Sequence, residues 1–561
     1  MKINSKFLVL GSLAFILVGG LVGCNPSTSE PDLPPSFSES VEANLVEDQD
    51  YVEHSKTYSK NNYDYDESKW FVNNLDKVPL PDPQIYVEND TYYIVGTSDR
   101  TSGTVIDCYS TKDFFNFDFH PAIYEPKGEG WESDVPYIYA PEIYKFDGVY
   151  YMYYSAIAEN GVRYNSVVQA DSVLGPYEAI VNDTVNGLTD PVFQEGAFDV
   201  LDATIFVDDD GKMYMYYATS GSKCQFISGV ELVSPYEANW DTKVDLVKPG
   251  EVSTNNPYAG MLWEMFRSYY IAEAPFMIKH NGKYIMTYSV NGCWNKYYNV
   301  CYAIADSPLG NFEKPYAKNQ VWTNLLLGYP GTNLATNKVF KQWAGFASGT
   351  GHHCFFKVGD QIMIAYHAHK NRDWDSETAY TQRYFAFDYL YFDKDGNPYC
   401  NGPTYSPQPM PEGISGYKNI ALDAKVRYIN VENAEAINDN YIVDCYNLPQ
   451  EAGKEVKLGN GYSFIELTFD KEYEIGGIAI YNSAYYDQVI YDVAYVDYGN
   501  GNAHTDLTFL EEKFVNHSTE FVFPNSAFTV DYKTSIKTNK VVVAFNLAEG
   551  GSVNEIAVLG K

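Results

Sequence analysis

Short strands arranged in pairs recur through the middle of the chain. Each pair has an alternating first strand, a turn built on Asn, Asp or Gly, and a second strand rich in Tyr, Met and Ile. Alternation with a period of two predicts a strand, and Asn-Gly between two apolar runs is a strong signal for a hairpin. The five pairs are Gln84–Ser98, Glu142–Ala156, Thr204–Thr219, Pro275–Ser289 and Cys354–Ala368.

The spacing of the hairpins indicates how they assemble. They recur roughly every 60 to 80 residues, which leaves room for one four-stranded blade and its loops per repeat. The similar segments Asp171–Ala179 and Asp306–Lys314 follow two of the hairpins at the same place. We therefore predict an all-β protein with a five-bladed β-propeller over residues 67–411. A long β-sandwich is the alternative, and these shared markers disfavour it.

The pattern changes after the proline-dense segment Pro403–Pro411. Strands of alternating polarity over residues 412–561 predict a second domain, a β-sandwich. Its opening, Asn419–Leu422, and its close, Asn554–Gly560, resemble the discoidin-like, galactose-binding sandwiches that are often attached to carbohydrate enzymes. Whether this domain binds sugar or only braces the propeller stays open.

The first 24 residues indicate where the protein is sent. Lys2 and Lys6 precede a short apolar run, which is typical of a secretory signal and too short for a transmembrane span. Leu21–Cys24 resembles a bacterial lipobox, so we predict Cys24 as the lipidated first residue of an exported lipoprotein at the cell envelope or surface. An ordinary signal is the alternative. Residues 25–66, rich in Ser, Pro and acidic residues, predict a flexible tether.

Composition narrows the class of partner. The net charge is −35, from 74 acidic and 39 basic residues, which excludes a nucleic-acid surface and favours neutral partners such as sugars. Of the eight cysteines, those after Cys24 are odd in number and contain no CxxC pair, so neither a disulfide framework nor a zinc site is indicated. A bridge between Cys293 and Cys301 stays open. The membrane contact expected is the lipid anchor alone, and we expect a monomer.

Polar residues stand just ahead of the first strand of each hairpin. In a propeller this strand lies nearest the axis, so these residues should converge on the central channel. Like charges facing one channel repel each other and lose hydration, so such a cluster implies chemistry or a bound cation. The candidates are Asp82, Glu142, Asp202, Glu273 and the pair His352-His353.

These residue types suit glycoside hydrolysis. That reaction needs one carboxylic acid to protonate the leaving oxygen and a second carboxylate to activate water or attack carbon. Glu273 lies between alanines, which favour its protonated form, and suits the general acid. Asp82 lies between two prolines that stiffen its backbone and suits the general base. Asp202 then fits a third carboxylate that raises the pKa of the acid.

The chain also resembles glycoside hydrolase family 43, whose members are five-bladed propellers that hydrolyse arabinofuranosides and xylosides with inversion. The resemblance spans roughly residues 69–411 and rests on one short motif ahead of each hairpin, all in the family's order. The motifs are Asp82-Pro83, Tyr139–Glu142, Leu201–Thr204, Ala272–Pro275 and Gly349–His353.

By position, the resemblance implies Asp82 as general base, Asp202 as pKa modulator and Glu273 as general acid. It also implies that Arg383 approaches the sugar. His352 would help to hold a water-coordinated calcium ion near the axis, with a satisfied core imidazole as the alternative. Ala274 stands where many members have glycine, which changes the room beside the acid. For Glu142, a bracing role and a direct contact with substrate are both open.

We therefore expect an exo-acting, inverting glycosidase that releases arabinofuranosyl or xylosyl units from plant cell-wall glycans such as arabinan, arabinoxylan and xylan. One alternative is an endo-α-1,5-L-arabinanase, which needs an open groove. Another, from a different class, is a non-catalytic glycan-binding lipoprotein on the same scaffold. The sequence does not rank arabinose against xylose, since loops between the blades shape the pocket.

Overall fold

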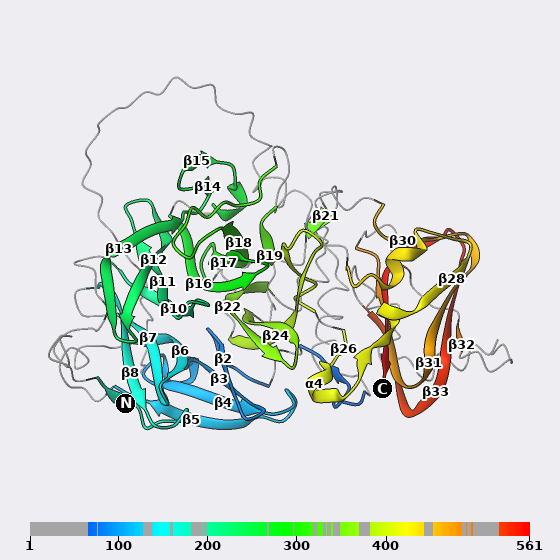
Figure 1. Ribbon diagram of the computed structural model, residues 1–561, viewed down its shortest axis with the longest axis horizontal. Helices are drawn as coiled ribbons and strands as arrows, with labels where there is room; N and C mark the ends of the chain where they lie inside the picture. The colour runs from blue at the N-terminus through cyan, green and yellow to red at the C-terminus, as the bar shows by residue number, and fades with distance from the viewer. Residues whose placement is uncertain are drawn as a thin grey trace, which may run out of the picture.

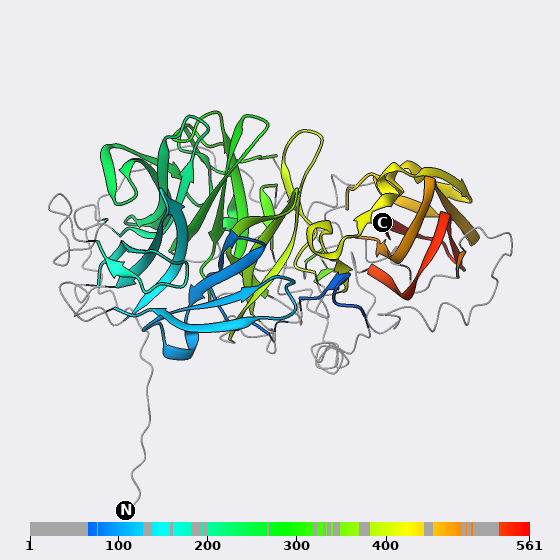
Figure 2. The ribbon, with the colours of Figure 1, turned by 60° about the horizontal axis from the view of Figure 1, so that its bottom comes forward.

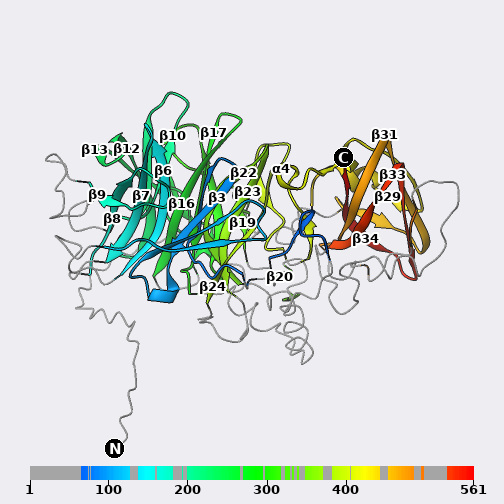
Figure 3. The same cartoon turned by 90° about the horizontal axis from the view of Figure 1, so that it is seen from below.

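A computed structural model shows two lobes side by side, built almost wholly of strands (Figures 1, 2 and 3). It describes residues 65–73, 75, 77–126, 137–157, 161–180, 193, 199–265, 269–294, 297–317, 323–328, 332–333, 338–339, 348–369, 382–404, 406–442, 453–484, 490, 495–497 and 527–561. Cys24, the predicted signal segment 1–24 and the predicted tether up to residue 64 lie outside these residues. Within them, no helix is long and apolar enough to span a membrane.

The larger lobe is the predicted five-bladed propeller, and each predicted hairpin forms the first two strands of one blade. Blade 1 holds β2–β5 (Gln84–Glu88, Thr91–Thr97, Ile106–Thr111, Asp118–Tyr124) and blade 2 holds β6–β9 (Ile138–Phe146, Val149–Ile157, Arg163–Ala170, Glu178–Ala179). Blade 3 holds β10–β13 (Leu201–Val207, Met213–Ser220, Cys224–Ser234, Glu237–Val247). Blade 4 holds β16–β19 (Tyr270–His280, Lys283–Val290, Asn299–Ala305, Leu325–Leu327) and blade 5 holds β22–β25 (Ser348–Val358, Gln361–His369, Arg383–Phe392, Pro398–Cys400).

The tyrosine-rich second strands are explained by burial on both faces. In β7, Tyr153 packs in a core shared with blade 3, whereas its neighbour Tyr154 packs in the core shared with blade 1. Both side chains are fully buried. A strand between two such cores needs large apolar side chains on both faces, which is why its sequence is a near-continuous apolar run.

Near the axis, each blade has one non-glycine residue in the left-handed backbone region, within its first strand or, in blade 1, two residues before it. In blades 2 to 5 this residue lies within a shift of strand register, as in a β-bulge. The five residues, with φ of 54°, 50°, 52°, 48° and 47°, are Asp82, Ala140, Asp202, Ala274 and His352. This corrects one prediction, because the blade-2 equivalent of Asp82 and Asp202 is Ala140. Glu142 lies two residues further along β6.

Blades 3 and 4 are joined by strand pairing as well as by packing. The start of β16 runs parallel to the start of β12, with Cys224 opposite Tyr270 and Gln225 opposite Ile271. This pairing brings Gln225 beside the predicted acid on β16. Shorter strand pairs are β14–β15 (Glu251–Ser253, Asn256–Ala259) and β20–β21 (Thr332–Asn333, Lys338–Val339), and short 3-10 helices span Asp99–Thr101 and Leu262–Glu264.

The smaller lobe is the β-sandwich. Its strands lie in the order β29-β30-β34-β31-β33-β32, with β27 paired to β34 and β28 paired to β31. They span Lys418–Asn419 (β27), Lys425–Ile429 (β28), Val431–Glu432 (β29), Val456–Leu458 (β30), Gly461–Asn482 (β31), Tyr495–Asp497 (β32), Ala527–Leu547 (β33) and Gly551–Gly560 (β34). Helix α4 (Glu412–Ser415) precedes it, and 3-10 helices lie at Ile420–Asp423 and Ala434–Asn438. The discoidin-like identity stays a prediction.

Chain segments from both ends of the propeller hold the two lobes together. β1 (Trp70–Phe71) pairs with β26 (Gln408–Pro409), and the fully buried Trp70 ring packs in a cluster with sandwich residues. Lys69 lies 2.5 Å from Asp531 Oδ1, which also accepts a hydrogen bond from Trp70 Nε1. Cys293 and Cys301 are free thiols, as are the other four cysteines among the described residues, so the bridge left open is not formed.

The buried Lys69–Asp531 ion pair makes a prediction about stability. We expect Asp531→Ala to lower the free energy of unfolding by about 3–5 kcal/mol, because the buried Lys69 ammonium would keep only the more distant and more exposed Asp66 carboxylate, at 3.7 Å, as a countercharge. Urea unfolding followed by circular dichroism measures the change. Lys283→Ala, which breaks an exposed pair with Asp306, is the control and should change stability by less than about 1 kcal/mol. Equal midpoints for the two variants would contradict the prediction.

Candidate active site

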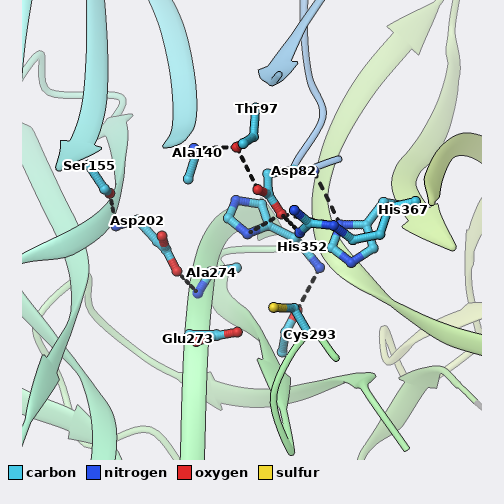
Figure 4. A network of polar contacts seen from close by, with 12 residues as sticks. Asp82, Thr97, Ala140, Ser155, Asp202, Glu273, Ala274, Cys293, His352 and His367 are labelled. Carbon is cyan, nitrogen blue, oxygen red and sulfur yellow. Dashed lines mark hydrogen bonds and ion pairs between the residues drawn. The ribbon is translucent and has the colours of Figure 1, made fainter. Parts of the chain in front are cut away.

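The three predicted catalytic carboxylates come together at the propeller axis. Figure 4 shows Asp82, Asp202 and Glu273 reaching one region from blades 1, 3 and 4. Asp82 and Asp202 occupy the left-handed position of their blades, whereas Glu273 lies one residue before it. Asp82 and Asp202 are buried and Glu273 is half-buried. Three carboxyl groups gathered in this way repel one another, so their protonation depends on their individual partners.

Asp82 is the carboxylate with a cation beside it. Its Oδ1 accepts a hydrogen bond from Arg383 Nη1 at 2.8 Å, and its Oδ2 accepts one from Thr97 Oγ1 at 2.6 Å. Burial alone would raise the pKa of Asp82, but the Arg383 guanidinium and nearby imidazoles hold it well below its ordinary value. Asp82 is therefore an anion over the whole working pH range, as a general base must be.

Two histidines of blade 5 flank Asp82. The Asp82 backbone N–H donates to His367 Nδ1 at 3.2 Å, and His352 Nδ1 lies 3.4 Å from Asp82 Oδ1. Burial lowers the pKa of both imidazoles, to about 3 for His367, so both are neutral. The same His367 Nδ1 also lies 3.3 Å from Asp82 Oδ1.

Asp202 is held by backbone and hydroxyl groups and has no cation in direct contact in the described part of the chain. Its N–H donates to Ser155 Oγ at 2.8 Å, and its Oδ2 accepts from the Ala274 N–H at 3.2 Å. Burial first, then repulsion by Glu273 and Asp82, raises the pKa of Asp202 well above its ordinary value, and the Ala274 amide opposes that shift.

Glu273 accepts two hydrogen bonds from neutral donors. Its Oε2 accepts from Gln225 Nε2 at 2.8 Å, and its Oε1 accepts from Tyr298 OH at 3.0 Å. Burial raises the pKa of Glu273, the two donors and then the Arg163 charge lower it, and the charge of Asp82 raises it again, so that the pKa stays above its ordinary value. The mutual repulsion of Glu273 and Asp202 makes the two carboxyls titrate as a pair that binds a proton more tightly than an exposed carboxyl does.

A glycine keeps Tyr298 in place against Glu273. A side chain at Gly351 would lie 2.3 Å from the Tyr298 ring, so that position tolerates no Cβ. The ring of Tyr298 also stacks on His367, with centroids 5.5 Å apart. The Gly-His motif ahead of the fifth hairpin therefore supports the acid from the neighbouring blade.

The structure also shows the contacts of the two other predicted residues. Arg383 contacts Asp82 and, at 3.2 Å, Asp99, and its approach to the sugar stays a prediction. Glu142 accepts a hydrogen bond from Tyr144, whose hydroxyl also lies 2.9 Å from Thr204. Burial raises the pKa of Glu142 to about 8, against the effect of these donors. The bracing alternative for Glu142 is thus favoured over a contact with substrate.

The axial calcium stays a prediction. Calcium prefers several oxygen ligands, and His352 offers one neutral imidazole whose Nδ1 faces Asp82. Among the described residues, no group of three or more His, Cys, Asp or Glu side chains is arranged to hold a metal ion. The residues that the structure describes therefore do not fit direct coordination of calcium, and no step below involves it.

Sequence reasoning missed several groups that hold the carboxylates. Thr97 and His367 contact Asp82, and Gln225 and Tyr298 contact Glu273. His367 lies near the end of the second strand of its blade, at the place that Thr97 occupies in blade 1. Aligning the second strands as well as the first would have singled out both. Gln225 and Tyr298 carry no such repeat signal.

Comparison with known proteins agrees with this geometry. Residues 73–398, more than half of the chain, match the family described as glycosyl hydrolases family 43. The chain belongs to this family. Family 43 enzymes are glycosidases with an inverting mechanism, so the predicted class of enzyme and its single-displacement chemistry are confirmed.

Three curated relatives share about a quarter of their residues with the chain. A β-D-galactofuranosidase of Aspergillus niger is 25% identical over 332 residues, covering 56% of this chain and 80% of that protein. A β-xylosidase of Xylanibacter ruminicola is 26% identical, covering 42% of this chain and 77% of that protein. An extracellular exo-α-(1→5)-L-arabinofuranosidase of Cellvibrio japonicus is 26% identical, covering 39% and 61%.

The contact between Arg383 and Asp82 makes a prediction for this family 43 site. We expect Arg383→Gln to raise the pKa of Asp82, because burial then acts without an opposing cation. The acid limb of kcat/KM against pH, below which the base is protonated, should move to higher pH by about one to three units. Arg100→Gln, which removes an arginine paired with Asp107, is the control. An unmoved acid limb in Arg383→Gln would contradict this account of Asp82.

Proposed function

We propose that the protein is an exo-acting glycosidase that releases arabinofuranosyl or xylosyl units from plant cell-wall glycans, with Asp82 as general base and Glu273 as general acid. The observation that carries the proposal is the contrast between these two carboxyls within one cluster. Asp82 is hydrogen-bonded to a cation that keeps it charged, whereas Glu273 accepts its hydrogen bonds from neutral donors, has a second carboxylate beside it, and feels the Arg163 cation only through space.

In the proposed mechanism, Asp82 removes a proton from a water molecule on one face of the sugar while that water attacks the anomeric carbon. Glu273 gives its proton to the leaving oxygen on the other face, so the bond breaks in one displacement with inversion. Asp202 stays close to the backbone beside Glu273, where its charge favours the protonated form of the acid. Arg383 and Thr97 hold the base in place.

The names of the relatives support the sugar class. The three are named for galactofuranose, xylose and arabinofuranose, and one of them is named as exo-acting and extracellular. All three names describe glycosidases for a single sugar type, which favours removal of one residue at a time over the endo-α-1,5-L-arabinanase alternative. A non-catalytic glycan-binding lipoprotein is the other alternative. Binding alone does not require one charged and one protonated carboxyl in the same cluster, so this alternative is disfavoured.

The extracellular relative also supports export. We propose that Cys24 anchors the protein by lipid at the cell envelope, with residues 25–66 as a tether. The propeller over residues 67–411 would then act as a monomer on soluble oligosaccharides or polymer ends, with the sandwich over residues 412–561 beside it. Mass spectrometry of the mature N-terminus tests the anchor: a lipid attached to Cys24 is expected, and an N-terminus without lipid would contradict it.

The roles of Glu273 and Asp82 can be distinguished by how the loss of activity in each variant depends on the leaving group of the substrate. We expect Glu273→Gln to lower kcat/KM on arabinobiose or xylobiose by about 10²–10⁴-fold, because an alkoxide leaves only with a proton. Nitrophenyl arabinofuranoside and xyloside need less protonation and should lose less. Asp82→Asn should slow both kinds of substrate alike, because each needs activated water.

The product and the substrate panel complete this test. NMR of the first product formed should show inverted anomeric configuration. Nitrophenyl galactofuranoside, arabinan and xylan complete the panel, and products longer than one sugar from arabinan would favour the endo alternative. If no substrate gives a Glu273-dependent product, the proposed function is wrong and the glycan-binding alternative stands.

A further inference from the structure

A repeated hydrogen bond links each blade of the propeller to the one before it. The left-handed residue near the axis donates its backbone N–H to a side chain at the end of the second strand of the preceding blade. The pairs are Ala140 to Thr97 (2.9 Å), Asp202 to Ser155 (2.8 Å), His352 to Ser289 (2.9 Å) and Asp82 to His367 (3.2 Å), which closes the ring.

The fifth link is different. In blade 4 the left-handed residue is Ala274, and its N–H donates to Asp202 Oδ2 at 3.2 Å. The strand register identifies the blade-3 residue that is equivalent to the acceptors of the other blades. Ser155 lies opposite Tyr139, Ser289 opposite Glu273 and His367 opposite Gly351, each acceptor facing the residue before the left-handed one. The blade-3 residue at this place, opposite Leu201, is Ala218.

Ala218 is fully buried and its methyl group cannot accept a hydrogen bond. We propose that Ala218 is a positioning residue for the acid: by withholding a hydroxyl, it leaves the Ala274 amide to Asp202 and so fixes that carboxylate beside Glu273. The inference rests on the proposed roles of Asp202 and Glu273. It goes beyond them by assigning a task to a residue that touches neither the substrate nor the reacting atoms.

Blade 1 shows what a hydroxyl at this place does. There Thr97 accepts from the Ala140 N–H and donates to Asp82 Oδ2 at 2.6 Å, so the hydroxyl stands between the carboxylate and the next blade. In blade 3 the equivalent carboxylate, Asp202, bonds the next blade directly. The peptide that it bonds joins Glu273 to Ala274, so the charge of the modulator lies against the strand that carries the acid.

The surroundings of Asp202 define what a change at position 218 would affect. The charged and titratable groups that interact with Asp202 are Glu273, Asp82, Arg163, Tyr139, Tyr298 and Cys293. Arg163 is the only cation among them, and it is itself paired with Asp199 at 2.7 Å. Little positive charge therefore offsets the repulsion between the carboxylates near Asp202. A small change in the position of Asp202 should then shift the pKa values of the Asp202–Glu273 pair.

The test inserts the missing hydroxyl. In Ala218→Ser, the new Oγ should accept from the Ala274 N–H and donate to Asp202, as Thr97 does for Asp82. Asp202 would then move away from Glu273, and the pair would release its proton at lower pH. The alkaline limb of kcat/KM should move down by about one pH unit. Ala218→Cys adds a sulfur atom at the same place, but a thiol forms only weak hydrogen bonds. The alkaline limb of kcat/KM in this variant should therefore match that of the wild type.

A second readout needs no substrate. Carboxyls whose pKa is raised on folding stabilise the fold fully below their unfolded pKa, and this stability is lost as the pH rises through the folded pKa. The contribution of this pair to the melting temperature should therefore fall as the pH rises above the ordinary values of 3.8 and 4.5 for these groups. The fall should be smaller in Ala218→Ser than in Ala218→Cys. In an Asp202→Asn background, Ala218→Ser should add no further change.

The outcomes distinguish this inference from the proposed function. If Ala218→Ser and Ala218→Cys show the same melting curves across pH, or the same alkaline limb, the role of Ala218 is wrong even if the enzyme is active. If no glycoside is hydrolysed but the melting curves differ as expected, the hydrogen-bond arrangement stands and the proposed function fails. If the difference persists in Asp202→Asn, position 218 acts through packing, which also overturns the inference.

Discussion

Five backbone N–H groups near the propeller axis need acceptors, and the way they obtain them organises the molecule. A bulge in the first strand of blades 2 to 5, and the left-handed residue just ahead of that strand in blade 1, each turn one amide out of its own sheet, and a buried amide without a partner is costly. The neighbouring blade supplies the partner, so each blade is fastened to the one before it. Among the described residues, no strand of blade 1 pairs with a strand of blade 5. The hydrogen bond from the Asp82 N–H to His367 links these first and last blades instead. The same backbone turn that closes the ring also points the side chains of Asp82 and Asp202 at the axis.

The left-handed backbone at these positions explains why the catalytic groups are so well fixed. A non-glycine residue pays about 1–2 kcal/mol to adopt this conformation, and the surrounding hydrogen bonds must compensate. Asp82 has four such contacts, from Thr97, Arg383 and two histidines. Fixing the base in this way costs nothing further when substrate binds, so its orientation is set before the reaction.

The sequence was sufficient for the hairpins because a period of two is visible locally, and five similar copies then implied the propeller. It was also sufficient for Asp82, Asp202 and Glu273 as residues at the axis. For Glu142 it left bracing and substrate contact open, because a bulge adds a residue and changes which side chain faces the axis. It failed for His367, whose partner lies in the first blade, far away in sequence. Contacts between blades join residues that are distant in sequence, so a local sequence pattern does not predict them.

Asp82 and Asp202 are the same residue type at equivalent positions with nearly equal backbone angles, yet their expected roles differ. The difference therefore lies in their neighbours and not in the repeat. Asp82 has a hydroxyl and a guanidinium, which stabilise its charge and suit the proposed general base. Asp202 has the backbone amide of Ala274, on the strand that carries the proposed acid, which suits the proposed modulator of Glu273. Single residues that differ between otherwise equivalent blades thus make an asymmetric site on a symmetric scaffold. The smallest such difference is the methyl group of Ala218.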